Sequence, residues 1–424
     1  MASPVTPPRG MRDILPADKA RRERVLATVR GVYRAHGFDE IETPVMEDAD
    51  RLHAGLGGDN EKLAFAVMRR GLTVDDLRTA ESPLDLADLG LRFDLTVPLA
   101  RFYASNRGQL PTVFRAIQVA PVWRAERPQK GRYRQFVQCD IDIIGEPGII
   151  AEVELIAATS AALDALGIPD CSIRVNDRRL LTAWLTRHGV PATLQPQALI
   201  TIDKLDKLGV DGVVEELVAL GVTQARDLFE ALAADEDDSW SLLQSPAFDG
   251  SPALDDLRAL RAALPELPLQ FDPFLVRGMG YYTGPIFEVA HPQLGYSLGG
   301  GGRYDGMIGR FLGSEVPATG FSLGFERLID LVQLAETGGA EDAALVYDRD
   351  VAPATIVTLQ AALVAEGARV RLLKRPKNLR AALEQLEADG FRRFAPVAHD
   401  TAPDPALLDW RRLGAADSTT TEGD

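Results

Sequence analysis

A cluster of basic side chains stands out in a chain whose formal net charge is −16. Residues 122–138 read VWRAERPQKGRYRQFVQ, and five lysines or arginines lie between Arg124 and Arg134, interrupted by Pro128 and Gly131. A guanidinium fixed at the base of a hairpin can fork onto a phosphate or a carboxylate. The alternative is a solvated basic turn. The stretch therefore predicts either an anion-binding hairpin or an ordinary surface loop.

Two further runs could contact a ligand. LGGGGRYDG (298–306) has neither the G-x-G-x-x-G spacing of a dinucleotide site nor the G-K-[ST] of a phosphate-binding loop. It is either a flexible hairpin turn or a strand without side chains against which a flat ligand could lie. PATGFSLGFERL (317–328) passes from small residues into a helix. Its Arg327 is either solvated or faces a nucleotide pocket.

Composition excludes several classes of protein. The net charge argues against indiscriminate nucleic-acid binding, which depends on Lys and Arg, so any such contact is confined to local basic patches. Two cysteines, Cys139 and Cys171, and five scattered histidines make neither a disulfide framework nor a zinc site. We expect no dedicated metal ligands, no signal peptide, no membrane span and a cytoplasmic location.

The first part of the chain alternates helix and strand patterns. Helices are predicted at 18–36, where Gly37 ends the apolar stripe, and at 150–166. A short strand is predicted at 41–43. The runs LRFDLTV, TVFRAIQV, APVWRAE and RQFVQCDIDIIG between 91 and 145 read as strands separated by turn residues. These patterns predict an α+β domain whose mostly antiparallel sheet is flanked by helices.

The remainder predicts additional modules. Residues 170–270 are rich in Leu, Ala and acidic residues and indicate a helical insertion. Strand character returns at 274–304, and GFERLIDLVQLAE reads as a helix, so 1–169 and 271–336 form the predicted core. Residues 343–412 alternate as βαβαβ, which predicts a small α/β domain. We expect a disordered tail at 413–424.

The order of these blocks resembles the three signature motifs of class II aminoacyl-tRNA synthetases. Two further blocks, GLRFDLTVPLAR (90–101) and LVRGMGYYTGPIFEV (275–289), are similar to the histidine-binding segments of histidyl-tRNA synthetases. PRGMRDILP (8–16) and LGGGGRYDG also match that family. The resemblance covers residues 8–335 and is weaker from 343 to 412, which is similar to the anticodon-binding domain of the family.

The resemblance implies a two-step reaction. Histidine attacks the α-phosphate of ATP to give histidyl-adenylate, and the 3′ end of tRNA-His then accepts the histidyl group. Catalysis would consist of positioning and of phosphate stabilisation by arginines and Mg²⁺. The helix and strand at 18–44 match the segment that forms the homodimer interface in the family. Histidine, ATP, tRNA-His and a second copy of the chain are thus the expected partners.

The roles of individual residues follow from the same resemblance. Arg124 and Arg277 are the expected catalytic residues at the α-phosphate, and ATP is also expected to contact Glu126 and Arg327. The expected histidine-binding residues are Asp94, Thr96 and Gln138 for the ammonium group, Asp142, Tyr282 and Tyr304 for the imidazole, and Arg277 and Tyr281. The expected contacts to the acceptor end of tRNA are Gln129, Arg132 and Arg134.

Two features depart from the family pattern. Gly280 stands where the family usually has an acidic residue before the paired tyrosines. The C-terminal domain looks shortened, since Pro396 interrupts its third predicted strand and no helix follows DWRRLG. The alternatives to a histidine–tRNA ligase are a regulatory subunit of ATP phosphoribosyltransferase and an adenylating enzyme with another acceptor. Retention of all three arginines disfavours the regulatory subunit.

Overall fold

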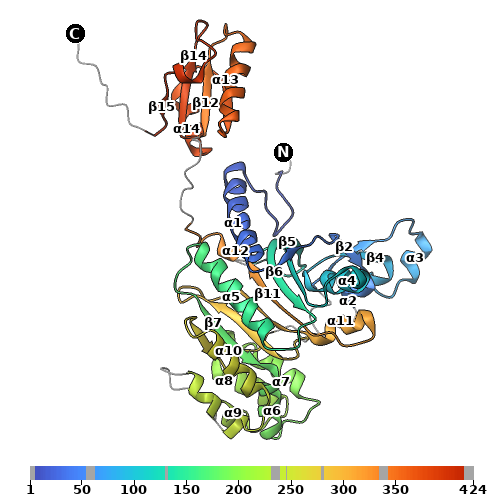
Figure 1. Ribbon diagram of the computed structural model, residues 1–424. Coiled ribbons are helices and arrows are strands. Elements are labelled where there is room, and N and C mark those ends of the chain that lie inside the picture. Colours follow the sequence, from blue (N-terminus) through green and yellow to red (C-terminus); the bar gives the residue numbers. More distant parts are fainter. Residues whose placement is uncertain are drawn as a thin grey trace. The chain divides into compact units, whose positions relative to one another are not determined.

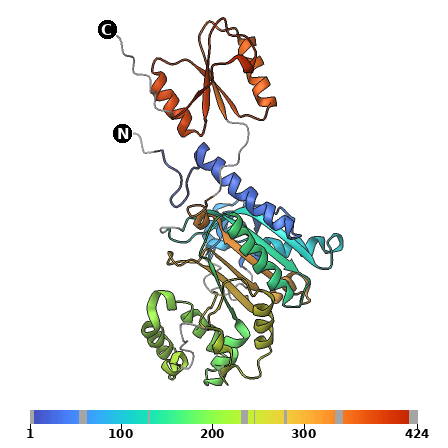
Figure 2. The same cartoon turned by 60° about the vertical axis from the view of Figure 1, so that its left-hand side comes forward.

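A computed structural model describes most of the chain (Figures 1 and 2). The described residues are 5–53, 63–128, 132–230, 239–244, 246–277, 281–333 and 342–414. Gln129, Gly280 and the tail from 415 onward lie outside these ranges. Contacts divide the chain into two compact units, Met1–Asp13 with Arg24–Leu334, and Ile14–Glu23 with Ala335–Asp424.

The larger unit is built on one eight-stranded sheet, in the order β1-β5-β6-β11-β10-β9-β7-β8. All neighbours pair antiparallel except β1 with β5 and β7 with β8, which are parallel. The strands are β1 (Asp39–Glu40), β5 (Phe114–Trp123), β6 (Gln135–Ile144), β7 (Ser172–Asp177), β8 (Leu269–Phe271), β9 (Pro285–Ala290), β10 (Gly299–Arg303) and β11 (Ala318–Gly324). The predicted mostly antiparallel sheet is confirmed.

Helices cover this sheet because strand alternation gives it one apolar face. Cys139, Ile141 and Ile143 of β6 are fully buried and belong to the main core, against which α5 (Ile150–Ala165) packs. The even-numbered residues of β6 point to the opposite face, where the cavity described below lies. The predicted helix at 18–36 is α1 (Pro16–Ala35), and Gly37 follows it with a φ of 83°.

A second small sheet, in the order β2-β4-β3, flanks the first (Figure 1). Its strands are β2 (Met46–Asp48), β3 (Phe65–Met68) and β4 (Ala87–Leu91). The helices around it are α2 (Ala49–His53), α3 (Val74–Thr79), η2 (Pro83–Leu86), α4 (Thr96–Asn106) and η3 (Arg107–Gln109). Beyond β10, α11 (Asp305–Leu312) packs against α4.

Three predicted elements were wrong in extent. The strand expected at 41–43 is β1, two residues earlier. The run LRFDLTV is only the end of β4 followed by a turn, because the Asp94 carboxylate accepts the Val97 N–H at 3.2 Å and starts α4. TVFRAIQV and APVWRAE are one continuous strand, β5.

The helix expected after Gly324 is also shorter than predicted. Within the described residues up to 333, it is the single turn α12 (Phe325–Leu328). The chain then leaves the helix, and the Gln333 N–H donates to the Leu166 carbonyl at the end of α5 at 3.1 Å. A tertiary hydrogen bond therefore replaces the helical continuation that the apolar pattern indicated.

The insertion begins and ends in the main sheet. Strand β7 and the first two residues of β8 lie inside the predicted range 170–270, so the helical part runs between these strands (Figure 2, green to yellow). Its helices are α6 (Arg178–Arg187), α7 (Gln195–Ile202), α8 (Leu205–Ala219), α9 (Ala225–Glu230), η4 (Ser239–Gln244), η5 (Pro246–Phe248) and α10 (Ala253–Ala263). Trp184 and Leu257, both fully buried, belong to the same core as the sheet.

The smaller unit contains the predicted α/β domain. Its sheet has the order β13-β12-β14-β15, and α13 and α14 lie on opposite faces of it (Figure 2). The elements are β12 (Ala343–Tyr347), α13 (Pro353–Ala365), β13 (Val370–Lys374), α14 (Leu379–Ala388), β14 (Arg393–Val397), η6 (Pro405–Leu407) and β15 (Arg411–Arg412). The predicted small α/β domain is confirmed.

Pro396 does not interrupt β14, contrary to the sequence interpretation. The Val397 carbonyl accepts the Asp348 N–H at 3.0 Å on the β12 side, so the alternate residue Pro396 directs its nitrogen to the other edge. There β15 pairs only with Arg393 and Phe394. The missing N–H of proline therefore breaks no ladder bond. None of the helices in the described part of the chain is long and apolar enough to cross a membrane.

Candidate active site

A cavity of about 260 Å³ opens on the face of the main sheet opposite α5. It is lined by β6, β10, β11 and the segments around Asp94, Arg124 and Arg277. The predicted site residues that the structure brings together there are Asp94, Thr96, Arg124, Glu126, Arg132, Gln138, Asp142, Arg277, Tyr281, Tyr282, Tyr304 and Arg327. Arg134 does not line it, and Gln129 lies outside the described residues.

The cavity is lined by two residues whose side chains carry acceptors that lack a partner in the described structure. Asp94 is 2% exposed; its Oδ1 accepts the Val97 N–H, and its Oδ2 is a buried oxygen with no hydrogen bond in the described structure. Gln138 donates from Nε2 to the Ser322 hydroxyl at 2.8 Å, which leaves its Oε1 without a bond within the same residues. Two buried acceptors without donors suit a ligand that brings N–H groups, such as an ammonium.

Burial also changes the ionisation of the aspartates that line the cavity. It raises the pKa of Asp94 to about 6, against the opposing effects of the Val97 N–H and the Arg124 charge. It raises the pKa of Asp142 to about 7, although the Tyr304 hydroxyl opposes the shift. Burial and the nearby Asp142 raise the pKa of Asp140 as well. Clustered carboxylates with elevated pKa values favour a cationic ligand, which would restore them to the charged form.

Three tyrosines form the wall beside Asp142. The Tyr304 hydroxyl donates to Asp142 Oδ1 at 2.6 Å. Tyr281 lies edge-on to Tyr304, with ring centroids 6.1 Å apart, and its ring is 4.8 Å from that of Tyr282. Burial raises the pKa of each of the three phenols, so the hydroxyls stay protonated at neutral pH. The cavity lining therefore includes neutral hydroxyl groups.

Basic side chains also line the cavity. Arg124, directly after β5, donates from Nε to the Phe93 carbonyl at 3.0 Å, and Arg277 pairs with Glu288 at 2.5 Å. Arg327 donates to the Ser297 carbonyl at 2.6 Å. Burial lowers the pKa of Arg327, and the charges of Arg132, Arg277 and Arg124 lower it further. Mutually repelling cations around one cavity favour a polyanionic ligand such as a triphosphate.

The glycine run makes room for these side chains. A Cβ on Gly300 would lie 2.6 Å from the Arg277 guanidinium carbon, and one on Gly302 would lie 2.9 Å from the Tyr282 ring. On the neighbouring strand, a Cβ on Gly320 would lie 1.9 Å from Asp142 Oδ1. The run is therefore a strand, β10, and not a flexible turn. Because the glycines lack side chains, Arg277 and Tyr282 can pack against β10, and the backbone of Gly299–Gly301 lines the cavity.

Of the arginines in the basic hairpin, some line the cavity and others bond to the backbone of the fold. Arg134 donates from Nε to the Glu126 carbonyl at 3.0 Å, and its backbone N–H donates to the Gly10 carbonyl at 2.8 Å. These bonds give Arg134 a role within the fold. Arg132 lies 3.8 Å from the Glu126 carboxylate at the cavity wall.

Sequence reasoning missed several residues at the site. Asp140 lies between Gln138 and Asp142 on the same face of β6, and strand alternation alone would have found it. Glu288, the partner of Arg277, and Glu326, whose carboxylate pairs with Arg12, gave no local signal. Both depend on contacts between segments far apart in the chain.

Comparison with known proteins identifies the family. The profile of histidyl-tRNA synthetases matches residues 10–328. A histidine–tRNA ligase of Leifsonia xyli subsp. xyli (strain CTCB07) is 60% identical over 420 residues, 95% of this chain and 97% of that protein. The crystal structure of histidyl-tRNA synthetase from Nostoc sp. PCC 7120 has a TM-score of 0.77 at 25% identity, covering 97% of this chain and 95% of that one.

The fold alone is shared more widely. A structure described as an ATP phosphoribosyltransferase regulatory subunit/histidyl-tRNA synthetase from Bacillus halodurans C has a TM-score of 0.75 at 22% identity, covering 95% of this chain and 100% of that one. At that identity the likeness shows only the fold.

The antiparallel sheet of the core and the family match of the chain together identify the protein as an aminoacyl-tRNA ligase, as predicted. More narrowly, the chain belongs to the histidyl-tRNA synthetase family. The near full-length match to a histidine–tRNA ligase supports that function over the regulatory subunit.

Proposed function

We propose that this chain activates histidine with ATP in the cavity on β6, β10 and β11 and transfers the histidyl group to the 3′ end of tRNA-His. The observation that carries the proposal is the division of the lining of one cavity between carboxylates, at Asp94, Asp140 and Asp142, and guanidinium groups, at Arg124, Arg277 and Arg327. An amino acid with a cationic end and a nucleotide with a polyanionic end fit this division.

Histidine would lie with its ammonium at Asp94 Oδ2 and Gln138 Oε1, two buried acceptors of cavity-lining residues that have no hydrogen-bond donor in the described structure. Its ring would face Asp142 and the tyrosine wall. An apolar side chain in the same position would leave the Asp142–Tyr304 pair without a ligand contact, which is a source of discrimination. Thr96 also lines the cavity and would add a hydroxyl.

ATP would lie with its phosphates at the arginines. Arg124 and Arg277 would hold the α-phosphate and Arg327 the γ-phosphate, so that their charges stand where negative charge develops. No side chain is needed as a nucleophile, because the carboxylate of histidine attacks. The main contribution of the chain is to hold two substrates in line.

Mg²⁺ would accompany ATP. Glu126 lines the cavity and its carboxylate lies 3.8 Å from Arg132, so an oxygen donor of the kind Mg²⁺ prefers is present. The ion would neutralise phosphate charge. Within the described residues no group of three or more His, Cys, Asp or Glu side chains forms a dedicated metal site.

We further propose that the protein is a cytoplasmic homodimer that acts apart from any membrane. The resemblance of α1 and β1 to the family's dimer segment supports the dimer, and so do Val45 and Met46, which are 41% and 45% exposed just after that segment. Light scattering coupled to size-exclusion chromatography measures the mass directly. A species at the 46.0 kDa mass of one chain would reject the dimer.

The test of the reaction is transfer of labelled histidine, with ATP and Mg²⁺, to a tRNA-His transcript. The matched variant is Arg277→Ala, which removes one cation and leaves Glu288 paired with Arg174. Charging by the wild type and its loss in the variant would support the proposal. Absence of charging with histidine-dependent ATP–pyrophosphate exchange intact would indicate another acceptor, and absence of both would reject the proposal.

A further inference from the structure

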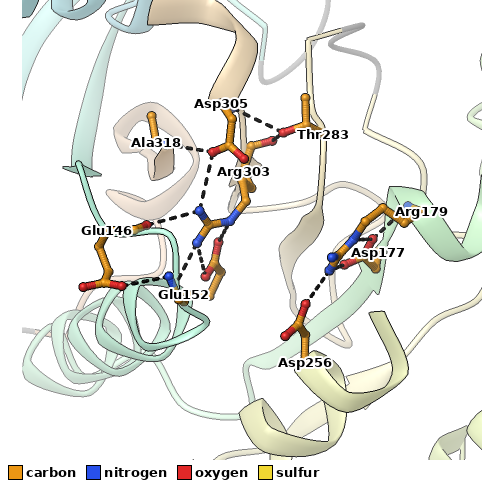
Figure 3. Close-up of polar contacts among 10 residues, drawn as sticks. Glu146, Glu152, Asp177, Arg179, Asp256, Thr283, Arg303, Asp305 and Ala318 are labelled. Carbon is orange, nitrogen blue, oxygen red and sulfur yellow. Dashed lines mark hydrogen bonds and ion pairs between the residues drawn. The ribbon is translucent and has the colours of Figure 1, made fainter. Parts of the chain in front are cut away.

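Arg303, the last residue of β10, sits in a network that the proposed reaction does not use (Figure 3). Its Nε and Nη2 donate to the two oxygens of Glu152 at 2.8 Å each. Its Nη1 donates to the Glu146 carbonyl at 3.2 Å and its Nη2 to the Gly148 carbonyl at 3.2 Å. The Arg303 side chain is 10% exposed and that of Glu152 is 0% exposed.

Strand alternation directs Arg303 away from the cavity. Gly300 and Gly302 would direct a Cβ at Arg277 and Tyr282 on the cavity side, so Arg303 projects to the face covered by α5, where Glu152 lies. A bidentate pair at this position ties the end of β10 to the first turns of α5. It therefore fixes the backbone at the end of β10, directly before Tyr304.

The same point joins the two segments that carry the tyrosine wall. The Arg303 carbonyl accepts the Thr283 N–H at 2.8 Å, directly after Tyr282. The Asp305 N–H donates to the Thr283 hydroxyl at 3.2 Å, and Figure 3 shows these contacts around Arg303. Gly284 passes close to Arg303, since a Cβ there would lie 3.1 Å from Arg303 Cδ.

Tyr304 is also fixed from its other side. Asp305 Oδ1 accepts the Ala318 N–H at 2.9 Å and lies 3.4 Å from Arg303 Nη1. The Tyr304 N–H donates to the Ala318 carbonyl at 2.7 Å. Ala318 begins β11, which carries Gly320 opposite Asp142. The anchors of Arg303 and Asp305 thus set Tyr304 against the carboxylate that its hydroxyl contacts.

We propose that Arg303 is a positioning residue for recognition of the histidine ring, acting through Tyr304 and Tyr282 without contacting the substrate. The proposal rests on the proposed function in assigning that ring to the tyrosine wall. A buried ion pair is by itself weak evidence for stability, because an apolar pair of similar volume often stabilises a fold equally well. The distinctive consequence of this pair is geometric: the contacts of the Arg303 side chain hold one backbone position.

The test compares Arg303→Lys with a matched control, Arg179→Lys. Arg179 also makes a bidentate pair with a fully buried carboxylate, Asp177, at 3.0 and 2.7 Å, and also contacts Asp256 (Figure 3). Histidine affinity is measured by calorimetry without ATP or tRNA, and Tm, kcat and the KM values for histidine and ATP are measured beside it. We expect Arg303→Lys to weaken histidine binding about tenfold, with kcat and the KM for ATP nearly unchanged.

A double variant separates positioning from stability. Arg303→Met with Glu152→Leu removes both buried charges, so Tm should return toward that of the wild type while histidine affinity stays low. Recovery of both together would overturn the proposal, as would equal losses of histidine affinity in Arg303→Lys and Arg179→Lys. Failure of the wild type itself to bind histidine would reject the proposed function instead.

Discussion

Replacement of Gly300 by alanine tests the cavity geometry directly. The added Cβ would lie 2.6 Å from both Cζ and Nη1 of Arg277 and 2.8 Å from the Phe287 carbonyl oxygen. Ordinary contact begins near 3.4 Å, so the guanidinium must retreat by about 0.8 Å, the difference between 3.4 and 2.6. Arg277 is held by Glu288 and cannot withdraw without straining that pair.

The expected cost follows from that displacement. A misplacement of about 1 Å in a positioned group can cost about 100-fold in rate, equivalent to about 2.7 kcal/mol of transition-state stabilisation. We therefore expect kcat/KM for histidine-dependent ATP–pyrophosphate exchange to fall about 100-fold in Gly300→Ala. Calorimetric binding of histidine alone should change much less, because Arg277 is assigned mainly to the α-phosphate.

The same glycine-rich segment offers the control. A Cβ on Gly306, in α11, would meet nothing within 4 Å outside the backbone of its own helix, so Gly306→Ala should leave exchange unchanged and raise stability by about 0.5 kcal/mol. Thermal unfolding of both variants shows whether the Phe287 contact has damaged the fold. A folded Gly300→Ala protein with exchange within about twofold of wild type would refute the assignment of Arg277.

Three other outcomes are expected. The folded-state pKa of Asp142 is about 7 and its ordinary value is 3.8, so the native state binds the proton more tightly, and the ionised carboxylate increasingly opposes folding as the pH rises from about 4 to about 7. Asp142→Asn should therefore be more stable than wild type at pH 8, and this advantage should vanish near pH 4. A pH-independent difference in urea unfolding would contradict this. Arg12→Ala removes the ion pair to Glu326 and a cation–π contact 3.9 Å from the Tyr133 ring, so KM for ATP should rise about fivefold while that for histidine is constant. Arg327→Ala should lower kcat/KM for ATP about 100-fold with calorimetric histidine affinity unchanged, and an equal loss in both would argue against a phosphate role.

Elements with strong periodicity were predicted well. The apolar stripe of α1 includes Val25, Val29 and Tyr33, all of them fully buried, and the βαβαβ order predicted for residues 343–412 matches β12, α13, β13, α14 and β14. Local pattern sufficed there because each element buries one face. It failed at LRFDLTV, where the Asp94 carboxylate turns an apolar run into a helix start.

The family resemblance predicted which residues line the site, but it did not predict the side chains that contact and position them. The sequence placed Arg277 at the site without its partner Glu288, and Tyr304 without the Arg303 network that precedes it. Both partners depend on the register of strands far apart in the chain. The glycines of residues 298–306 could not be assigned from the sequence for the same reason. Their composition allowed a turn as well as a strand, and the structure shows a strand against which Arg277 packs at Gly300.

The charge of Arg124 acts on both the carboxylates and the arginines that line the cavity. Its charge lowers the pKa of Asp94 and of Asp140 against the larger effect of burial, and it also lowers the pKa of Arg327. One guanidinium is therefore felt both by the carboxylates proposed for the ammonium of histidine and by the arginine proposed for the terminal phosphate of ATP. The reacting groups, an amino-acid carboxylate and an α-phosphate, are both anionic and repel each other. A cation between two anions reduces that repulsion, and this is the role that we propose for Arg124.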